Sequence, residues 1–422
     1  MVYFGNVVLI LAGLISIYSA YLFFVRLKDK RKPHLVRKAY ISLFVLFGAI
    51  TLASLVLLYG FIAKDFSFDY VASYSSADMG LFYRISAFWA GHQGSFLFWL
   101  WLLSGFTALL AYFRLKEVDR LSSYALAVLN GVQLFFWFFI VFLANPFKPA
   151  EVFVSTGLGI NPLLLHWAMI FHPPTLFVGY AGLTIPFAYA VAALLARDAS
   201  SKWVDLSFRW TLVSWLLLTI GIFLGAVWAY VVLGWGGYWG WDPVENASLL
   251  PWLAGAALLH SFHIYRQRES FKFWALSMAV LSFVLVIIAT FITRSGIIQS
   301  VHAFAGNPGI IIVFSTFIVI ILGLSGYLIY DRRALYEGKH LFSSVFSRDF
   351  AYHVNNIFMV FAAAVLLMAA FLPLFGGRTV GPTFYNRLAQ PLGVAFLAVI
   401  AICPMLSWGK TSGQRFLRLS RI

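Results

Sequence analysis

Charged residues are scarce in this sequence, and their scarcity excludes a soluble protein. Asp, Glu, Lys and Arg make up 11% of its 422 residues, whereas an average soluble domain carries about 25%. The length alone would suggest two or three soluble domains, but too few charges remain to cover their surfaces. Disordered and collagen-like chains are excluded as well, because 62% of the residues are hydrophobic. We therefore predict a polytopic membrane protein.

Cysteine is almost absent too. Cys403 is the single cysteine, and it lies in an apolar run. One thiol cannot form an intrachain disulfide, a CxxC motif or a zinc cluster. The first apolar segment has no basic leader and only a weak cleavage signal at Ser19-Ala20, so we interpret it as a membrane span rather than a signal peptide.

Long apolar runs are what the sequence has in place of charge. A helix needs about 20 residues to cross a bilayer. Runs of suitable length lie near residues 2–25, 39–63, 95–113, 124–143, 174–196, 211–233, 249–265, 273–293, 310–330, 354–374 and 388–407. The predicted fold class is an all-α polytopic integral membrane protein with about 11 transmembrane helices, forming a single helical membrane domain over residues 1–422.

The basic residues predict how the chain is oriented. One alternating set of loops, together with the C-terminal tail, holds 24 of the 30 Lys and Arg residues. The opposite set holds six: Lys64, Arg84, Lys148, Arg294, Arg378 and Arg387. Cytoplasmic loops collect positive charge, so we expect the N-terminus outside and the C-terminus in the cytoplasm. Because topology accounts for the whole basic excess, we expect no nucleic-acid partner.

The most distinctive predicted external segment is Trp-rich and spans residues 234–248, ending in WGGYWGWDPVENAS. Aromatic belts place Trp and Tyr singly at span ends. Here three Trp and one Tyr occupy seven positions among glycines, which permit unusual backbone conformations. We interpret the segment as a flat aromatic platform for a large planar apolar ligand, with an aromatic belt as the alternative.

The same segment contains a helix start. Asp242 is a suitable N-cap, Pro243 suits the first turn, and Glu245 stands three residues after Asp242, as in a capping box. Asp242 and Glu245 are therefore as compatible with a structural role as with a ligand-binding one.

Three of the nine histidines are candidate ligands of a metal. His172 precedes two prolines and His302 lies in a predicted external loop, so together they flank the Trp-rich segment. Two imidazoles beside an aromatic platform can supply axial nitrogens to a haem iron. His260 lies deep inside a span, where an ionisable residue is a functional candidate. The alternative is a neutral histidine bonded to a neighbouring helix, and the small residues at 255–257 admit either a porphyrin edge or a close helix contact.

Six short motifs together resemble the WWD family of haem-handling proteins, which assemble c-type cytochromes. They are FWAGHQGS (88–95), FHPP (171–174), WGGYWGWDPVENAS (235–248), LHS (259–261), TRSG (293–296) and SVHAFA (300–305). The VEN ending of the Trp-rich motif resembles the haem lyase branch of the family, which works in the multi-component Ccm maturation system.

The resemblance implies the roles of particular residues. His172 and His302 match the two external histidines that ligate incoming haem, and they are the expected catalytic residues. His260 matches the transmembrane histidine that ligates a resident b-type haem. The implied cofactor-binding residues are Trp235, Gly236, Gly237, Tyr238, Trp239, Trp241, Asp242, His172, His302 and His260, of which the three histidines bind metal.

The resemblance also implies partners and a location. Haem arrives from the chaperone CcmE, and reduced apocytochrome c presents its CxxCH motif through a CcmH-type protein. Quinol is the implied electron source, and the site faces the periplasmic side of the inner membrane. Full-length relatives continue into further spans that carry the second ligand of the b haem, so we expect a separate chain with the missing C-terminal spans to supply it.

Two other functions stay open. One is a haem transporter, which requires discontinuous helices near the bilayer midplane. The other is a redox subunit in which a b haem accepts electrons from quinol. Four external cations, Arg84, Arg294, Arg378 and Arg387, are candidates to pair with haem propionates, although each also suits an ordinary interface anchor.

Overall fold

The structure is a computed structural model that describes residues 1–28, 33–152, 154–300, 306–337, 344–376 and 380–419. Within these ranges the chain forms helices and no β-strand. Eleven of the helices in these described ranges are long and apolar enough to cross a membrane. Each of the predicted spans corresponds to one of them, so the predicted all-α polytopic fold class is confirmed.

The long helices follow one another along the chain. Their bounds are α1 Val2–Lys28, α2 Pro33–Ala63, α5 His92–Arg114, α6 Arg120–Phe142, α7 Trp167–Ala196, α8 Lys202–Val232, α9 Pro243–Arg268, α10 Lys272–Arg294, α11 Pro308–Asp331, α13 Arg348–Phe371 and α14 Pro382–Ile402. The longest connections lie between α2 and α5 and between α6 and α7. Short helices lie between them or after them: α3 Asp69–Tyr74, α4 Leu81–Ser86, η1 Ala87–Trp89, η2 Pro162–Leu164, α12 Arg333–Tyr336, η3 Leu372–Phe375, η4 Cys403–Met405 and α15 Gly413–Leu419.

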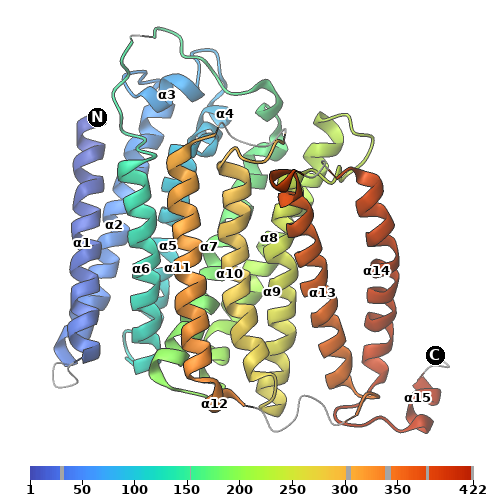
Figure 1. Cartoon of the computed structure of the whole chain (residues 1–422). Helices are drawn as coiled ribbons and strands as arrows, with labels where there is room; N and C mark the ends of the chain where they lie inside the picture. Colours follow the sequence, from blue (N-terminus) through green and yellow to red (C-terminus); the bar gives the residue numbers. More distant parts are fainter. Residues whose placement is uncertain (29–32, 153, 301–305, 338–343, 377–379, 420–422) are drawn as a thin grey trace.

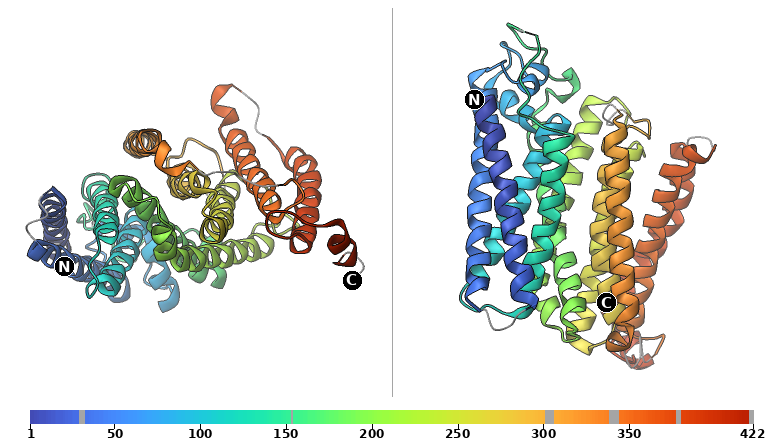
Figure 2. Two further views of the ribbon diagram at one scale, coloured as in Figure 1. Left: turned by 90° about the horizontal axis from the view of Figure 1, so that it is seen from below. Right: turned by 60° about the vertical axis from the view of Figure 1, so that its left-hand side comes forward.

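The two ends of the chain lie at opposite ends of the helix assembly (Figure 1). The N-terminus, α3, α4 and the connection between α6 and α7 share one end, which we call the N-terminal face; the other end is the C-terminal face. Seen along the helices, the assembly is elongated, with α1 and α2 at one extreme and α13 and α14 at the other (Figure 2). In the most apolar stretches of α7 and α10, 83% of the residues are buried, whereas none are buried in that of α14. Helices α7 and α10 are therefore central and α14 is peripheral.

Helix α7 begins seven residues earlier than the prolines of FHPP predict. The Nδ1 atom of His166 accepts a hydrogen bond from the Ala168 N–H at 3.3 Å and caps the helix, which starts at Trp167. Pro173 and Pro174 therefore lie inside the helix, where neither has an N–H to donate. The prolines mark a position in the helix, not its first turn.

Helices α7 and α8 approach each other closely because glycines line their contact. A Cβ added to Gly179 would lie 2.9 Å from Cβ of Leu218 and 3.0 Å from its backbone nitrogen. A Cβ added to Gly221 would lie 2.9 Å from the backbone nitrogen of Leu176. Small residues allow this backbone approach in membrane helices, where packing rather than the hydrophobic effect drives association.

We expect Gly179→Ala to separate α7 from α8 and to lower the free energy of unfolding by about 1–3 kcal/mol, the usual range for overpacking. The measurement is the thermal transition of the purified protein in detergent. Gly131→Ala on α6 is the matched control, because a Cβ at that position meets nothing within 4 Å. Equal transition temperatures for the two variants would contradict the close contact.

Candidate functional site

A cavity of about 400 Å³ lies toward the N-terminal face, between α3, η1, α7, α8, α10 and the start of α9. Its volume is within the range of small-molecule sites. Apolar side chains that line it include Trp89, Leu176, Phe177, Ile222 and Trp228. Polar side chains that line it include Tyr74, His172, Glu245, Thr293 and Arg294. The cavity thus combines aromatic and aliphatic walls with one imidazole, one guanidinium and one carboxylate.

His172 is fixed in this cavity by α8. Its Nδ1 atom lies 2.7 Å from the carbonyl oxygen of Gly221, so the Nδ1–H donates and the lone pair of the neutral ring is on Nε2. This arrangement is typical of metal-binding histidines, whose second nitrogen donates to a backbone carbonyl. The ring also fits against Gly225, where an added Cβ would lie 2.6 Å from Cε1 of His172.

The aromatic residues of the Trp-rich segment point in different directions. Trp239 lines the cavity. Tyr238 instead stacks on Tyr230 of α8, with ring centroids 4.5 Å apart and planes 14° apart. Trp241 stacks on Tyr385 of α14, at 5.0 Å and 8°. Because the planes of Trp239 and Trp241 differ by 84°, these rings do not form the single flat platform that we expected.

Trp235 and the glycines shape the segment itself. The ring of Trp235 covers Gly240, where an added Cβ would overlap the indole. Gly236 has a φ of +71°, a conformation that glycine adopts without strain. A Cβ added to Gly236 or Gly237 would meet nothing within 4 Å among the described residues. Trp235, Gly236 and Gly237 therefore shape the turn, and they are not among the described residues that line the cavity.

The predicted capping box is present at the start of α9. Asp242 Oδ1 accepts from the Val244 N–H at 2.9 Å, and Glu245 Oε2 accepts from the Asp242 N–H at 3.3 Å. Glu245 Oε2 also accepts from the Gly240 N–H at 2.9 Å. Both carboxylates thus have the structural role, and Glu245 lines the cavity in addition.

Asp242 also connects the Trp-rich segment to the chain that follows α10. The Ser300 hydroxyl donates to Asp242 Oδ1 at 2.6 Å. His302 lies outside the described residues, so its position relative to His172 stays a prediction. Ser300, two residues before it, is held at the start of α9.

His260 belongs to a different part of the molecule. It lies 17 residues after Pro243 on α9, or about 26 Å at 1.5 Å per residue, and it is not part of the cavity lining. Its ring centroid is 5.0 Å from that of Tyr352 on α13. Its Nδ1 atom is buried without a hydrogen-bond partner among the described residues, while Asn356 of α13 interacts with the ring, as the alternative of a histidine bonded to a neighbouring helix predicts. A buried imidazole nitrogen of this kind suits a metal ligand.

The small residues near His260 take part in a helix contact. A Cβ added to Gly255 would lie 3.1 Å from Cδ1 of Trp215 on α8. Trp215 stacks on Trp252 with centroids 5.3 Å apart. Of the two expectations for this stretch, close helix packing is the one that the described structure supports at Gly255.

The four predicted external cations have different environments. Arg294 is 7% exposed and lines the cavity. Arg84 is partly exposed and donates to the carbonyl oxygen of Ile62 at the protein surface. Arg387 on α14 is exposed. Arg378 lies outside the described residues. Among the described cations, Arg294 is therefore the one that the fold brings to the cavity.

The sequence did not indicate that the region before α5 contributes to the cavity. Tyr70 on α3 accepts from the Gly91 N–H at 2.8 Å and donates to the carbonyl oxygen of Phe88 at 3.1 Å. These bonds fix the turn that carries Trp89 into the cavity wall. The signal was the paired glycines of FWAGHQGS: a Cβ at Gly94 would meet the Tyr70 ring at 2.7 Å.

The chain is similar to known proteins over most of its length. The family described as cytochrome C assembly protein matches residues 89–299, which include the cavity walls from η1 to α10. The chain is 37% identical to the cytochrome c-type biogenesis protein CcmF of Escherichia coli K12, over 98% of this chain and 65% of that protein. It is 38% identical to the probable cytochrome c-type biogenesis protein NrfE of the same organism, over 89% of this chain and 69% of that protein.

A solved structure named cytochrome c heme lyase CcmF has the same fold, with a TM-score of 0.81 and 30% identity. The match covers 98% of this chain and 63% of that one, so the chain spans somewhat less than two thirds of this relative. The resemblance to the WWD family that the motifs indicate is confirmed. The chain belongs to the cytochrome C assembly protein family.

Proposed function

We propose that the chain binds haem in the cavity, with His172 as an axial ligand, and supports its covalent attachment to the CxxCH motif of apocytochrome c. The observation that carries the proposal is the hydrogen bond from His172 Nδ1–H to the Gly221 carbonyl, which leaves the lone pair of the neutral ring on Nε2. Trp239 lines the same cavity and offers an aromatic contact for the porphyrin. His302 is the second proposed axial ligand.

The proposed contribution of the chain to the reaction is binding and orientation. Addition of a cysteine thiol across a haem vinyl group forms a carbon–sulfur bond and transfers the thiol hydrogen to the other vinyl carbon. The nucleophile comes from the apocytochrome and the acceptor from haem. Holding the two in register supplies the proximity that converts a bimolecular step into an effectively unimolecular one.

The proposed setting is the outer side of an inner membrane. The 24-to-6 distribution of basic residues supports a C-terminal face in the cytoplasm, and the cavity lies toward the opposite face. The names of relatives in cytochrome c-type biogenesis support partners of the Ccm system: a CcmE-type haem chaperone, a CcmH-type protein and apocytochrome c. The haem-transporter alternative requires discontinuous spans, whereas the described spans are continuous helices.

We propose a second haem, of b type, with His260 as one axial ligand. The buried Nδ1 of His260 and the adjoining ring of Tyr352 support it. Asn356 is 0% exposed and donates to Ser261 Oγ at 3.0 Å, which fixes α13 against α9 beside His260. When bound, such a haem accepts and releases single electrons, with quinol as the proposed donor.

His172→Ala should abolish haem binding in the cavity, because it removes the axial nitrogen. The measurement is a haem titration of the purified chain followed by its absorption spectrum. His166→Asn is the matched control: it lies six residues earlier, and asparagine retains the helix cap. Gly225→Ala should weaken binding although both proposed axial histidines, His172 and His302, remain in the sequence, because its Cβ displaces the His172 ring. Haem binding by His172→Ala equal to that of the control would refute the assignment.

His260→Ala should remove the b-type haem spectrum and leave haem binding in the cavity unchanged, because His260 lies about 26 Å along α9 from its start. His353→Ala is the control, since this histidine contacts Phe271 and Trp274 at the C-terminal face. The spectra are recorded in the ferric and ferrous states. The assignment is wrong if the b-type spectrum survives in His260→Ala.

A further inference from the structure

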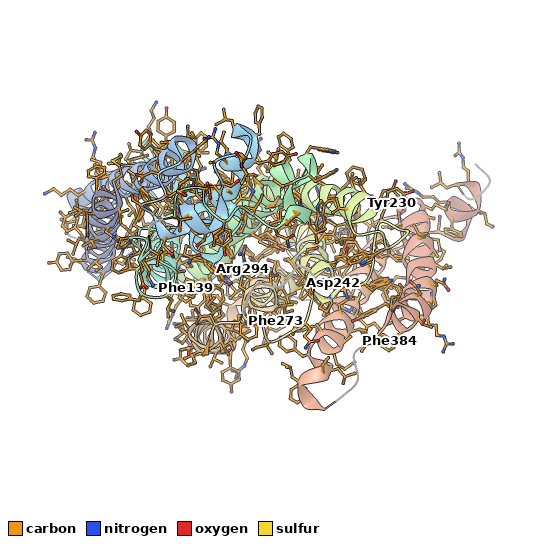
Figure 3. The ribbon with its side chains drawn as sticks, turned by 90° about the horizontal axis from the view of Figure 1, so that it is seen from above. Phe139, Tyr230, Asp242, Phe273, Arg294 and Phe384 are labelled. Carbon is orange, nitrogen blue, oxygen red and sulfur yellow. The ribbon has the colours of Figure 1, made fainter. Side chains whose placement is uncertain are left out.

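Arg294 places a positive charge inside the molecule, beside the cavity. It is the last residue of α10, is 7% exposed and lines the cavity. Seen from the N-terminal face, it lies near the middle of the assembly, whereas Phe384 lies toward one end (Figure 3). A charge removed from water is costly unless other groups stabilise it. In a sequence with 11% charged residues, its position calls for a physical reason.

The groups around Arg294 include aromatic rings and neutral hydroxyls. The guanidinium lies 5.9 Å from the ring centroid of Phe96. Tyr70 and Tyr74 of α3 are close enough to interact with it electrostatically. Burial raises the pKa of both phenols above the ordinary value of 10, so both stay neutral at physiological pH. Neutral phenols and a ring face stabilise a cation, and the carboxylate of Glu245 lines the same cavity.

The charge stands in the same cavity as a metal-binding imidazole and an indole. His172 comes from α7, Trp239 from the Trp-rich segment and Arg294 from α10, so three separate elements supply three kinds of contact. Guanidinium groups bind carboxylates through paired, charge-assisted hydrogen bonds. A ligand that satisfies all three contacts is planar, carries a metal and has carboxylates on one edge.

We infer that Arg294 binds the propionate carboxylates of the haem and thereby sets its orientation in the cavity. The inference rests on the proposed function and extends it. Propionates and vinyl groups occupy opposite edges of the porphyrin. With the propionates held at the end of α10, the vinyl edge points away from Arg294, toward the other elements of the cavity. Thiols of an apocytochrome then approach the edge on which the new bonds form.

The test compares haem with its dimethyl ester, which has the same iron and porphyrin plane but no carboxylates. Each is titrated into the purified full chain and followed by the absorption change that depends on His172. The wild type should bind haem about 10- to 100-fold more tightly than the ester, the ratio that corresponds to one charge-assisted interaction. Arg294→Gln should bind the two ligands with equal affinity, at the level of the ester.

Two further variants separate charge from structure. Arg294→Lys keeps the charge and should retain part of the preference for haem. Arg84→Gln removes a cation outside the cavity and should behave as the wild type. Retention of the full preference by Arg294→Gln overturns the inference, and so does equal loss of both ligands by Arg294→Gln and Arg294→Lys. If the wild type shows no His172-dependent binding of either ligand, the proposed function itself fails.

Discussion

The contact between α7 and α8 fixes the imidazole of His172, the proposed axial ligand, in the cavity. His172 is half-buried in the cavity wall, and a hydrogen bond to a backbone carbonyl fixes its ring and tautomer. Gly221 brings the α8 backbone close enough for its carbonyl to accept from His172 at 2.7 Å, and Gly225 leaves space for the ring. The same glycines therefore allow the helices to meet and fix which ring nitrogen of His172 is available to the proposed haem iron. A side chain at either position would disturb both.

The aromatic residues of the Trp-rich segment make different contacts. Trp241 donates to Asn386 Oδ1 at 2.8 Å and stacks on Tyr385, so it attaches the segment to α14. Tyr238 attaches it to α8 through Tyr230. Anchored on both sides, the segment presents Trp239 to the cavity. The dense run of aromatics is thus explained by two anchors and one wall residue, not by a surface in which every ring contacts the ligand.

Asp242 connects the Trp-rich segment to the chain that follows α10. The chain must turn from α8 into α9 within a few residues, and the capping box stabilises the new helix from its first turn. The Ser300 hydroxyl shares the Asp242 carboxylate with that cap. Loss of the carboxylate would therefore affect the start of α9 and the chain after α10 together. A residue that the sequence marks as a cap also sets the spacing between two walls of the site.

The sequence correctly predicted the structural features that depend on residues close together in the chain. Hydropathy predicted all 11 spans, and the order of Asp242, Pro243 and Glu245 predicted the capping box. Side-chain environments that depend on helices far apart in the sequence could not be predicted. Arg84 and Arg294 were both predicted to be external cations, yet Arg294 is buried in the fold beside Phe96 of α5 whereas Arg84 is partly exposed. The flat platform was wrong because the partners of the rings, Tyr230 and Tyr385, lie outside the motif.

The two histidine environments are separate because α9 has different neighbours at its two ends. Its start meets the cavity, and its second half meets α13, where aromatic side chains continue from His260 toward the C-terminal face. Tyr352 lies 5.0 Å from His260 and stacks on Trp408, with centroids 6.0 Å apart and planes 16° apart. Arg348 lies 5.3 Å from the Trp408 ring centroid. One helix therefore lines a cavity with aromatic, aliphatic and polar walls near its start and carries a largely buried histidine among aromatic side chains toward its other end.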